Sequence, residues 1–309
     1  MTLQQLEYVV ALNNYRHFVN AADKCFVTQP TLTMQIKKLE DEIGMQLFDR
    51  SKTPLQPTKA GINFIEKAKS IIREVNELKE MVSSEKETIE GEFTLAIIPT
   101  IAPYLLPNFL NNFTKTYPKT ILKIKEMQSH EIVAQLKNDE LDLGILATPL
   151  LENSIREVPV YYEPFVLFLP RNHKLLNKEF VQGEEIRTEE LLLLSEGHCF
   201  REQALEVCSY SGYQNQSAFR YESGSIETIK QMVSKGIGIT LIPKLAILND
   251  TDQKFSRPFV APEPSREISI VTHKSFVKEK LIDIIHESMK ASVPESMNKA
   301  QRRIRVVWR

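Results

Sequence analysis

The spacing of apolar residues changes at Gly91, and this change most constrains the fold. Before Gly91 the apolar residues recur every three or four positions, as they do in helices. After it, short apolar runs such as 93–98 alternate with helical segments, which is typical of a parallel sheet with crossover helices. A chain of 309 residues, 42% of them hydrophobic, is long enough for more than one core. We therefore predict an α/β protein with a small helical domain at its start.

Two short helices and a better marked third helix are predicted in the first 44 residues. Residues 3–12 and 18–25 carry apolar side chains at helical spacing. Thr28 is a capping residue ahead of Pro30, which the first turn of a helix tolerates. The third helix then runs to Gly44, a typical stop. Two short helices followed by a capped third predict a helix-turn-helix.

A possible wing and a long helix follow. Two short extended pieces around a turn fit the polar stretch from Asp49 to Pro57. A helical pattern then runs from the capping residue Thr58 to about Glu87, and its length predicts a linker that pairs with a copy of itself. A helix packed onto its own domain is the alternative. The predicted domains are a winged helix-turn-helix at 1–58, a linker helix at 59–90, a two-lobed α/β domain at 91–300 and a basic, disordered tail at 301–309.

The part after Gly91 contains two series of strands and helices. Lobe I is predicted at about 91–162 and 267–300, and lobe II at about 163–266. Ligands in such sheets lie beyond the carboxyl ends of the strands, so a cleft between the lobes is expected. The apolar runs that predict the strands and helices of lobe II, and the return to the first sheet, are Phe165 to Leu169, Leu191 to Leu194, Ile226 to Val233, Ile237 to Ile242, Ile268 to Val271 and Leu281 to Met289.

Charge gives no global sign of nucleic-acid binding, because the formal net charge is −1. From Thr28 to Gly61 five bases face four acids, so DNA binding would need a one-sided distribution. A helical bundle with a solvated polar face is the alternative. The residues predicted to reach base edges and phosphates, from the third helix and the loop after it, are Gln29, Pro30, Thr31, Thr33, Gln35, Lys37, Lys38, Arg50, Lys52 and Lys59.

A long motif runs through the same segment: Ala21-Ala22-x-x-Cys25-x-x-Thr28-Gln29-Pro30-Thr31-Leu32-Thr33-x-x-Ile36-x-x-Leu39-Glu40-x-x-Ile43-Gly44-x-x-Leu47-Phe48-x-Arg50. This motif resembles the winged helix-turn-helix of LysR-type transcriptional regulators. The resemblance covers nearly the whole chain and implies two lobes similar to periplasmic binding proteins. It also implies double-stranded DNA, RNA polymerase and further copies of the chain, as homodimers or homotetramers, as partners. Cys25 stands where the family usually has Leu, so we expect a small core hydrophobe there.

Three cysteines and the absence of export signals bear on the compartment. No segment approaches the ~18 to 20 apolar residues of a membrane span, and the start lacks a secretory signal pattern. We expect the chain in the cytoplasm, away from membranes, where cysteines do not form a structural disulfide framework. No Ser-His-Asp, P-loop or dinucleotide motif is present, so we predict neither an enzyme nor a cofactor. His198, Cys199 and Cys208 lack a fourth partner at zinc-like spacing, so no metal site is predicted.

Two of the cysteines are nine positions apart. Gly197 and the polar run after it predict a helix start with Cys199 in the first turn, where the helix dipole, His198 and Arg201 would favour the thiolate. On one continuous helix Cys199 and Cys208 would lie roughly 13 Å apart along the axis. A disulfide needs Cα atoms within about 7 Å. A bond between them would therefore require refolding, as in a redox switch; two core cysteines without chemistry are the alternative.

The run Gly197-His198-Cys199 with Cys208 at its spacing resembles the hydrogen-peroxide-sensing members of the LysR family. The resemblance implies that Cys199 reacts with peroxide and that Cys208 resolves the product into a disulfide. It also implies a peroxide pocket with Thr100 and Ser129, to which we add His198 and Arg201. The predicted function is a thiol-disulfide switch that controls antioxidant genes. A regulator that binds a small organic co-inducer in the interlobe cleft is the alternative.

Overall fold

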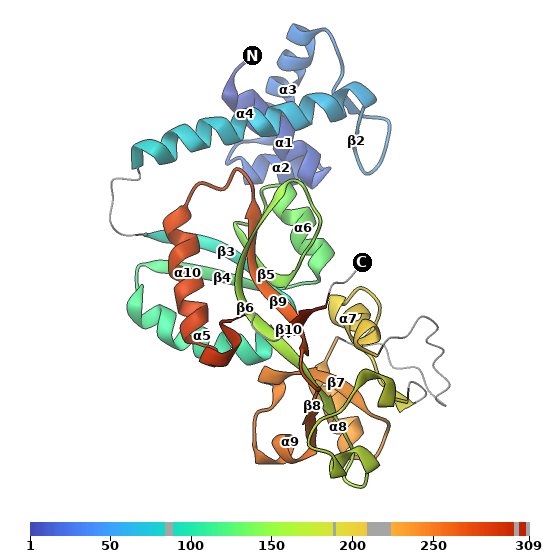
Figure 1. The fold of residues 1–309 in the computed structure, drawn as a ribbon. Coiled ribbons are helices and arrows are strands. Elements are labelled where there is room, and N and C mark those ends of the chain that lie inside the picture. Colours follow the sequence, from blue (N-terminus) through green and yellow to red (C-terminus); the bar gives the residue numbers. More distant parts are fainter. Residues whose placement is uncertain (84–88, 188–189, 209–223, 300–302, 307–309) are drawn as a thin grey trace. The chain divides into compact units, whose positions relative to one another are not determined.

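The structure is a computed structural model that describes residues 1–83, 89–187, 190–208, 224–299 and 303–306. The chain divides into two compact units, Met1–Glu87 and Thr88–Arg309, and each is described by itself. Figure 1 labels the elements of both units. Within the described ranges, none of the helices combines the length and the apolar character that a bilayer crossing needs.

Three helices enclose the core of the first unit. They are α1 (Leu3–Tyr15), α2 (Phe18–Lys24) and α3 (Gln29–Ile43). The Thr28 hydroxyl accepts the Thr31 amide and so caps α3, and Gly44 ends this helix in the left-handed region at φ 70°. Leu32 and Ile36 of α3 are fully buried against the other two helices. The predicted helix-turn-helix arrangement is confirmed.

A short two-stranded wing follows α3. Strands β1 (Phe48–Asp49) and β2 (Gln56–Pro57) pair antiparallel. Buried Glu40 ties α3 to the wing, because one carboxylate oxygen accepts the Leu47 and Phe48 amides while the other accepts the Arg50 guanidinium at 2.7 Å. The Glu40 carboxylate, which counts against the local positive charge in the sequence, is therefore bonded inside the domain.

Helix α4 (Lys59–Ser83) is the longest helix that the structure describes in the first unit. The Thr58 hydroxyl accepts the Gly61 amide, which is the predicted cap. Ile65 and Ala68 are buried, whereas Ile62 is 51% exposed and Leu78 is 64% exposed. Apolar side chains left in solvent at helical spacing fit a helix that pairs with a second copy, which stays a prediction.

Lobe I of the second unit is a mixed sheet with helices on both faces. Strands β4, β3 and β5 run parallel, β9 pairs antiparallel with β5, and β6 pairs antiparallel with β9. The expected parallel sheet is thus present in three strands, while β9 runs the other way because it returns from lobe II (Figure 1). The bounds are β3 (Gly91–Ile97), α5 (Ala102–Thr116), β4 (Thr120–Glu126), α6 (Ser129–Lys137), β5 (Leu143–Thr148), β6 (Ile155–Phe168), β9 (Glu263–His273) and α10 (Glu279–Ala291).

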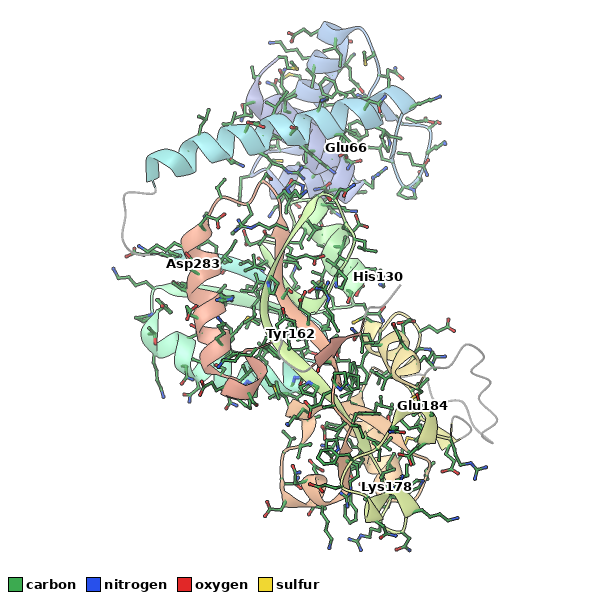
Figure 2. The ribbon with its side chains drawn as sticks, viewed as in Figure 1. Glu66, His130, Tyr162, Lys178, Glu184 and Asp283 are labelled. Carbon is green, nitrogen blue, oxygen red and sulfur yellow. The ribbon has the colours of Figure 1, made fainter. Side chains whose placement is uncertain are left out.

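Lobe II is built on the second half of β6, which pairs with two short strands. The long strands β6 and β9 run through both lobes, so the lobes share their central strands (Figure 1). Figure 2 shows Asp283 on α10 of lobe I and Lys178 in lobe II. The bounds are η1 (Lys174–Asn177), η2 (Gly183–Glu185), α7 (Cys199–Val207), α8 (Ile226–Ser234), β7 (Thr240–Pro243), η4 (Lys244–Ala246), α9 (Asp250–Phe255) and β8 (Ser256–Pro258), with η5 (Glu295–Met297) following α10.

Two sequence expectations in the second unit need correction. The run Leu191 to Leu194 forms no extended strand and makes only an isolated bridge, from Leu191 to Ile239. The tail is not disordered throughout: β10 (Arg303–Arg305) pairs parallel with β9, and Val306 is buried. Residues 263–265 of β9 supply backbone hydrogen-bond partners for β10. The local sequence of the tail does not reveal this pairing, because β9 is distant along the chain. The other tail residues, 301–302 and 307–309, lie outside the described residues.

Candidate functional site

Cys199 is the first residue of α7, and it lies where the two lobes meet. Its helix belongs to lobe II, yet its side chain packs with the lobe I core, whereas Phe200 and Cys208 pack with the lobe II core. The Cys199 side chain is 4% exposed, and its thiol is free. A change at this sulfur therefore acts on both lobes at once.

Ser129 approaches Cys199 from lobe I. Ser129 begins α6, and its hydroxyl donates a hydrogen bond to the Cys199 sulfur at 3.7 Å. The preceding residue, Gln128, fixes the same turn through a capping box with Glu131. Gly197, at φ 88°, brings the start of α7 against Gln128, because a Cβ on Gly197 would lie 2.6 Å from the Gln128 Oε1. The sequence pair of Ser129 and Cys199 is thus brought together in space.

Arg266 is the buried cation of this site. Its guanidinium, 1% exposed, lies over the Phe200 ring at 5.2 Å from the ring centroid. It donates to the Glu163 Oε2 at 2.7 Å and to both the hydroxyl and the carbonyl oxygen of Thr100, at 2.9 and 3.0 Å. Because Glu163 also accepts the Leu245 amide, both members of this buried ion pair are hydrogen-bonded on several sides.

The Cys199 thiol experiences opposing influences. Burial raises its pKa above the usual value, while the positive charge of Arg266 and the hydrogen bond from Ser129 act against that rise. The sequence expectation of a depressed pKa at the helix start is therefore wrong, because desolvation outweighs the other effects. What the site provides is a fixed cation and a donor that favour the thiolate once it forms.

His198 and Arg201 are not among the charges that lower the pKa of Cys199, and their place in the peroxide pocket stays a prediction. Burial lowers the pKa of His198, so its imidazole is neutral near pH 7 and adds no positive charge. Gly224 packs against the His198 imidazole, because a Cβ on Gly224 would lie 2.6 Å from two atoms of that ring. The Arg201 guanidinium donates to the Leu194 carbonyl oxygen at 2.9 Å. Thr100 is held by Arg266, so its hydroxyl is tied to the buried cation.

Cys208 caps the other end of α7 and lies in the lobe II core. Burial raises its pKa to about 12, and among the described residues no charge or hydrogen bond opposes that rise. Gly183 supports this end of the helix, because a Cβ on Gly183 would lie 2.3 Å from the Val207 carbonyl oxygen. With α7 intact between them, the two thiols are separated by nearly the helix length, roughly 13 Å along the axis. They cannot bond without refolding of α7.

The side of the first unit that the sequence predicts to face DNA is largely polar and exposed. On α3, Gln29, Pro30 and Lys37 are exposed, and Thr31 and Thr33 are half-buried. In the wing Lys52 is exposed and bonds to Gln56 at 3.3 Å, whereas Arg50 pairs with Glu40 and lies over the Phe18 ring. Arg50 therefore has a structural partner in addition to any contact with phosphate.

Of the other residues predicted from the sequence, Lys38 and Lys59 are exposed and Gln35 is half-buried. Cys25 is half-buried beside the helix-turn-helix core. Burial raises its pKa, in keeping with a small packing residue. Across the part of the chain that the structure describes, no three His, Cys, Asp or Glu side chains lie together in a way that would hold a metal ion.

Comparison with known proteins adds the family to this geometry. Residues 3–62 match the bacterial regulatory helix-turn-helix proteins of the lysR family, and residues 86–290 match the LysR substrate binding domain. The chain belongs to the LysR family. The hydrogen peroxide-inducible genes activator of Pectobacterium carotovorum is 39% identical over 94% of this chain and 97% of its own length. The DNA-binding transcriptional dual regulator OxyR of Escherichia coli K12 is 38% identical over 88% of this chain and 89% of its own length.

Solved structures of LysR regulators show the same fold. A full-length OxyR variant from Pseudomonas aeruginosa matches with a TM-score of 0.80 at 33% identity, over 95% of this chain and 99% of that one. A hydrogen-peroxide-bound mutant of OxyR from Corynebacterium glutamicum matches with a TM-score of 0.62 at 27% identity, over 94% of this chain and 92% of that one. The two-lobed α/β fold expected from the sequence is confirmed.

Sequence reasoning missed Arg266 and Glu163 of this LysR chain. Each stands beside or within an apolar strand, in Arg266-Glu267-Ile268-Ser269-Ile270 and in Tyr161-Tyr162-Glu163-Pro164-Phe165. A charged residue in a strand that is buried on both faces needs a partner of opposite sign. That signal was present in the sequence, but only the fold shows that the two strands meet and that their charges lie beside α7.

Proposed function

We propose that this chain is a hydrogen-peroxide-responsive transcriptional regulator that controls antioxidant genes through the thiols of Cys199 and Cys208. The observation that carries the proposal is the placement of Cys199, buried between the lobes with the Ser129 hydroxyl on its sulfur and the Arg266 charge nearby. Relatives named as hydrogen peroxide-inducible genes activators share this full-length architecture.

The first chemical step occurs at Cys199. The Cys199 thiolate attacks one oxygen of hydrogen peroxide, the O–O bond breaks, and the departing hydroxide takes a proton and leaves as water. Cys199 becomes a sulfenic acid, so the sulfur is oxidised and the peroxide is reduced. Arg266 and Ser129 stabilise the thiolate that this step requires. Thr100, held by Arg266, is the further hydroxyl that we propose for the peroxide pocket, and His198 and Arg201 stay in the proposed pocket as neighbours of Cys199 in the sequence.

The second step joins the two thiols. Cys208 leaves its core site, its thiolate attacks the Cys199 sulfur, and hydroxide leaves and is protonated to water. In sum, two thiols and one peroxide give one disulfide and two waters. Because α7 separates the two sulfurs, the bond forms only when the helix refolds, and this couples chemistry to shape. The reaction occurs once per reduction, so we propose a switch and not an enzyme.

The first unit provides the proposed output. Gln29, Thr31 and Lys37 on α3, with Lys52 in the wing, would contact base edges and phosphates of double-stranded DNA. Self-association through α4, whose Ile62 and Leu78 are exposed, would place several such domains on one DNA site. The proposal further includes contact with RNA polymerase and a cytoplasmic location, where cellular reductants return the disulfide to thiols.

The testing experiment compares Cys199→Ser with wild type. DNA footprints and transcription from a bound promoter are measured with and without micromolar peroxide. The variant should bind DNA as wild type does and lose the peroxide response. An unaltered response in the variant would sink the redox proposal and favour a small organic co-inducer.

The matched control is Lys37→Ala, an exposed change on α3. It should weaken DNA binding by about 1 kcal/mol or more while leaving peroxide oxidation of the thiols unchanged. Normal DNA binding by this variant together with Gln29→Ala would contradict the assignment of α3 as the reading helix.

A further inference from the structure

Strand β10 lies against the helix that must refold. Its residues Arg303, Ile304 and Arg305 pair in register with Glu263, Pro264 and Ser265 of β9, and the Val306 amide then donates to the Ser265 carbonyl oxygen at 2.9 Å. The Val306 side chain is 4% exposed within the lobe II core. This short strand is therefore anchored at its end by a residue that shares a core with α7.

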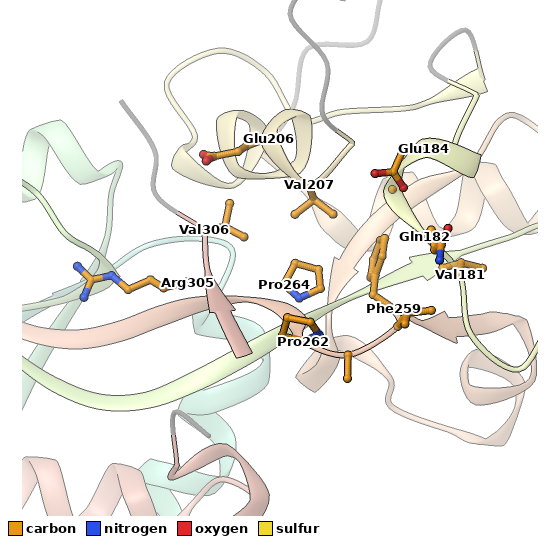
Figure 3. A pocket seen from close by; sticks show the side chains of 13 residues that line it. Val181, Gln182, Glu184, Glu206, Val207, Phe259, Pro262, Pro264, Arg305 and Val306 are labelled. Atoms are coloured by element: carbon orange, nitrogen blue, oxygen red, sulfur yellow. The ribbon is translucent and has the colours of Figure 1, made fainter. Parts of the chain in front are cut away.

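Gln203 connects β10 directly to α7. Gln203 lies between the two cysteines on α7 and is fully buried, and its Nε2 donates to the Val306 carbonyl oxygen at 3.1 Å. Its Oε1 accepts no hydrogen bond from any described residue, so the Val306 carbonyl is the polar contact that orients this amide. Figure 3 shows Val306 projecting toward Glu206 and Val207 of α7 from above Pro264.

The space around this contact is only partly filled. A cavity of about 520 Å³ is lined by residues of β10, of the end of α7 and of the turn at η2, among them Val306, Val207 and Gly183. Glu184, labelled in Figures 2 and 3, lies on that turn. On the lobe II side, the described contacts of this end of the chain are the Gln203 hydrogen bond and the packing of the Val306 side chain.

On the lobe I side Arg305 anchors β10 by a half-exposed ion pair. Arg305 donates to the Glu267 carboxylate at 3.0 Å, and its side chain is 40% exposed. Glu267 is shared, because its other carboxylate oxygen accepts the Thr148 hydroxyl at 2.8 Å; burial and the Glu267 charge together raise the pKa of Tyr162, which Figure 2 labels on β6. A half-exposed ion pair contributes little to stability. A three-residue strand is marginal by itself, so the hydrogen bond from Gln203 of α7 adds to what keeps β10 on β9.

We propose that β10 is part of the redox switch: Gln203 and Val306 hold it on α7 while both thiols are reduced, and formation of the Cys199–Cys208 disulfide releases it from β9. This inference rests on the proposed function. The physical reason is that a disulfide across α7 unwinds the turns that contain Gln203, so the buried Val306 carbonyl loses its donor. By reciprocity, β10 favours the dithiol form because it binds that form alone.

Hydrogen exchange of the full-length chain tests the release. In the reduced protein the peptide that contains Arg305 and Val306 should exchange slowly. After stoichiometric peroxide, with two thiols lost by alkylation and mass measurement, its exchange should rise by about tenfold or more. Cys208→Ser, which takes peroxide at Cys199 and forms no bridge, should keep the peptide protected. A disulfide with unchanged exchange would overturn this inference alone.

Substitutions that weaken the contacts of β10 in the reduced protein test the same coupling between β10 and α7. Gln203→Leu keeps the side-chain size and removes the donor, so the same peptide should exchange about fivefold faster in the reduced protein. Arg305→Gln tests the outer anchor, and its matched control is Arg156→Gln, which removes the exposed Arg156–Glu279 pair of lobe I. Equal exchange in all of these proteins would overturn the proposal.

A glutathione titration gives an independent reading. In a variant that ends at Asn298, the equilibrium should shift about tenfold toward the disulfide, a potential about 30 mV more negative. An unshifted potential would overturn the coupling. Failure of the wild-type chain to form a disulfide, with peroxide or in the titration, would overturn the proposed function together with this inference.

Discussion

Cys199 and Cys208 stand at opposite ends of one nine-residue helix, and both are buried thiols, yet their surroundings differ. At Cys199 the charge of Arg266 and the hydroxyl of Ser129 oppose the effect of burial on the pKa. At Cys208 no described residue opposes the effect of burial, and the pKa rises to about 12. The comparison teaches that burial alone does not decide whether a cysteine reacts; a fixed cation and a donor at the sulfur do.

The comparison also orders the two chemical steps. Cys208 is a poor nucleophile as long as it stays in the lobe II core, because its thiolate is scarcely populated there. When α7 refolds and Cys208 reaches solvent, its pKa falls toward the ordinary value and the thiolate becomes available. Refolding therefore both closes the distance and activates the second thiol.

The largest expected effect separates the two ends directly. At pH 7 we expect Cys199→Ser to react with peroxide at least about 100-fold more slowly than Cys208→Ser, because a thiol with a pKa near 12 is almost entirely protonated. Stopped-flow mixing with a sulfenic-acid probe and mass spectrometry measures both rates. Similar rates in the two variants would break the comparison.

The next effect concerns the cation. Arg266→Gln should slow oxidation of Cys199 by about tenfold, one pKa unit, and should also lower the free energy of unfolding by about 3–5 kcal/mol because Glu163 is left buried and unpaired. The two effects are measured by peroxide kinetics and by urea unfolding.

A second substitution separates charge from stability. The pair Arg266→Gln with Glu163→Gln removes the stranded charge and should recover most of the unfolding free energy without restoring the rate. Recovery of the rate along with the stability would mean that Arg266 acts only through folding.

The pH dependence sharpens the same point. Because burial holds the pKa of Cys199 above its ordinary value, the thiolate fraction, and with it the oxidation rate, should rise about tenfold per pH unit between pH 6 and 8. The rate of peroxide consumption by Cys208→Ser measures this. A rate that is level across this interval would show a depressed pKa and contradict the geometry.

The smallest effect belongs to the hydroxyl. Ser129→Ala removes the hydrogen bond to the Cys199 sulfur and should slow oxidation by about three- to tenfold, the value of one such bond. Ser129→Thr keeps the hydroxyl and should stay near the wild-type rate. If Ser129→Ala and Ser129→Thr slow the reaction equally, the effect is packing around α6 and not the donor.

Much of the fold was predictable from local patterns. Thr28, Pro30 and Gly44 mark α3 by capping chemistry that works within a few residues, and the apolar stripe around Leu32 and Ile36 identifies its buried face. The run Leu191 to Leu194 was expected in the strand-and-helix series of lobe II and forms neither a strand nor a helix, because a short apolar run has the same appearance in a regular element and in a buried loop.

The candidate site was predictable only in part. Cys199, Cys208 and Ser129 follow from spacing and resemblance, and the structure joins Cys199 to Ser129. His198 and Arg201 do not supply the positive charge expected at the thiol, because burial keeps the His198 imidazole neutral and the Arg201 guanidinium donates to the Leu194 carbonyl oxygen. Arg266 and Glu163 were absent from the predicted set, since they are distant along the chain from α7.

The sequence by itself determined the order of the domains, the helices with their caps, and a pair of cysteines too far apart on a helix to bond. These properties depend on neighbours within a few turns, where spacing and residue type suffice. Only the tertiary structure decided which cation meets Cys199, why Cys208 is protected, and that β10 is paired with β9 and tied to α7 through Gln203. Those depend on contacts between segments far apart in the chain, and electrostatics and burial act through space.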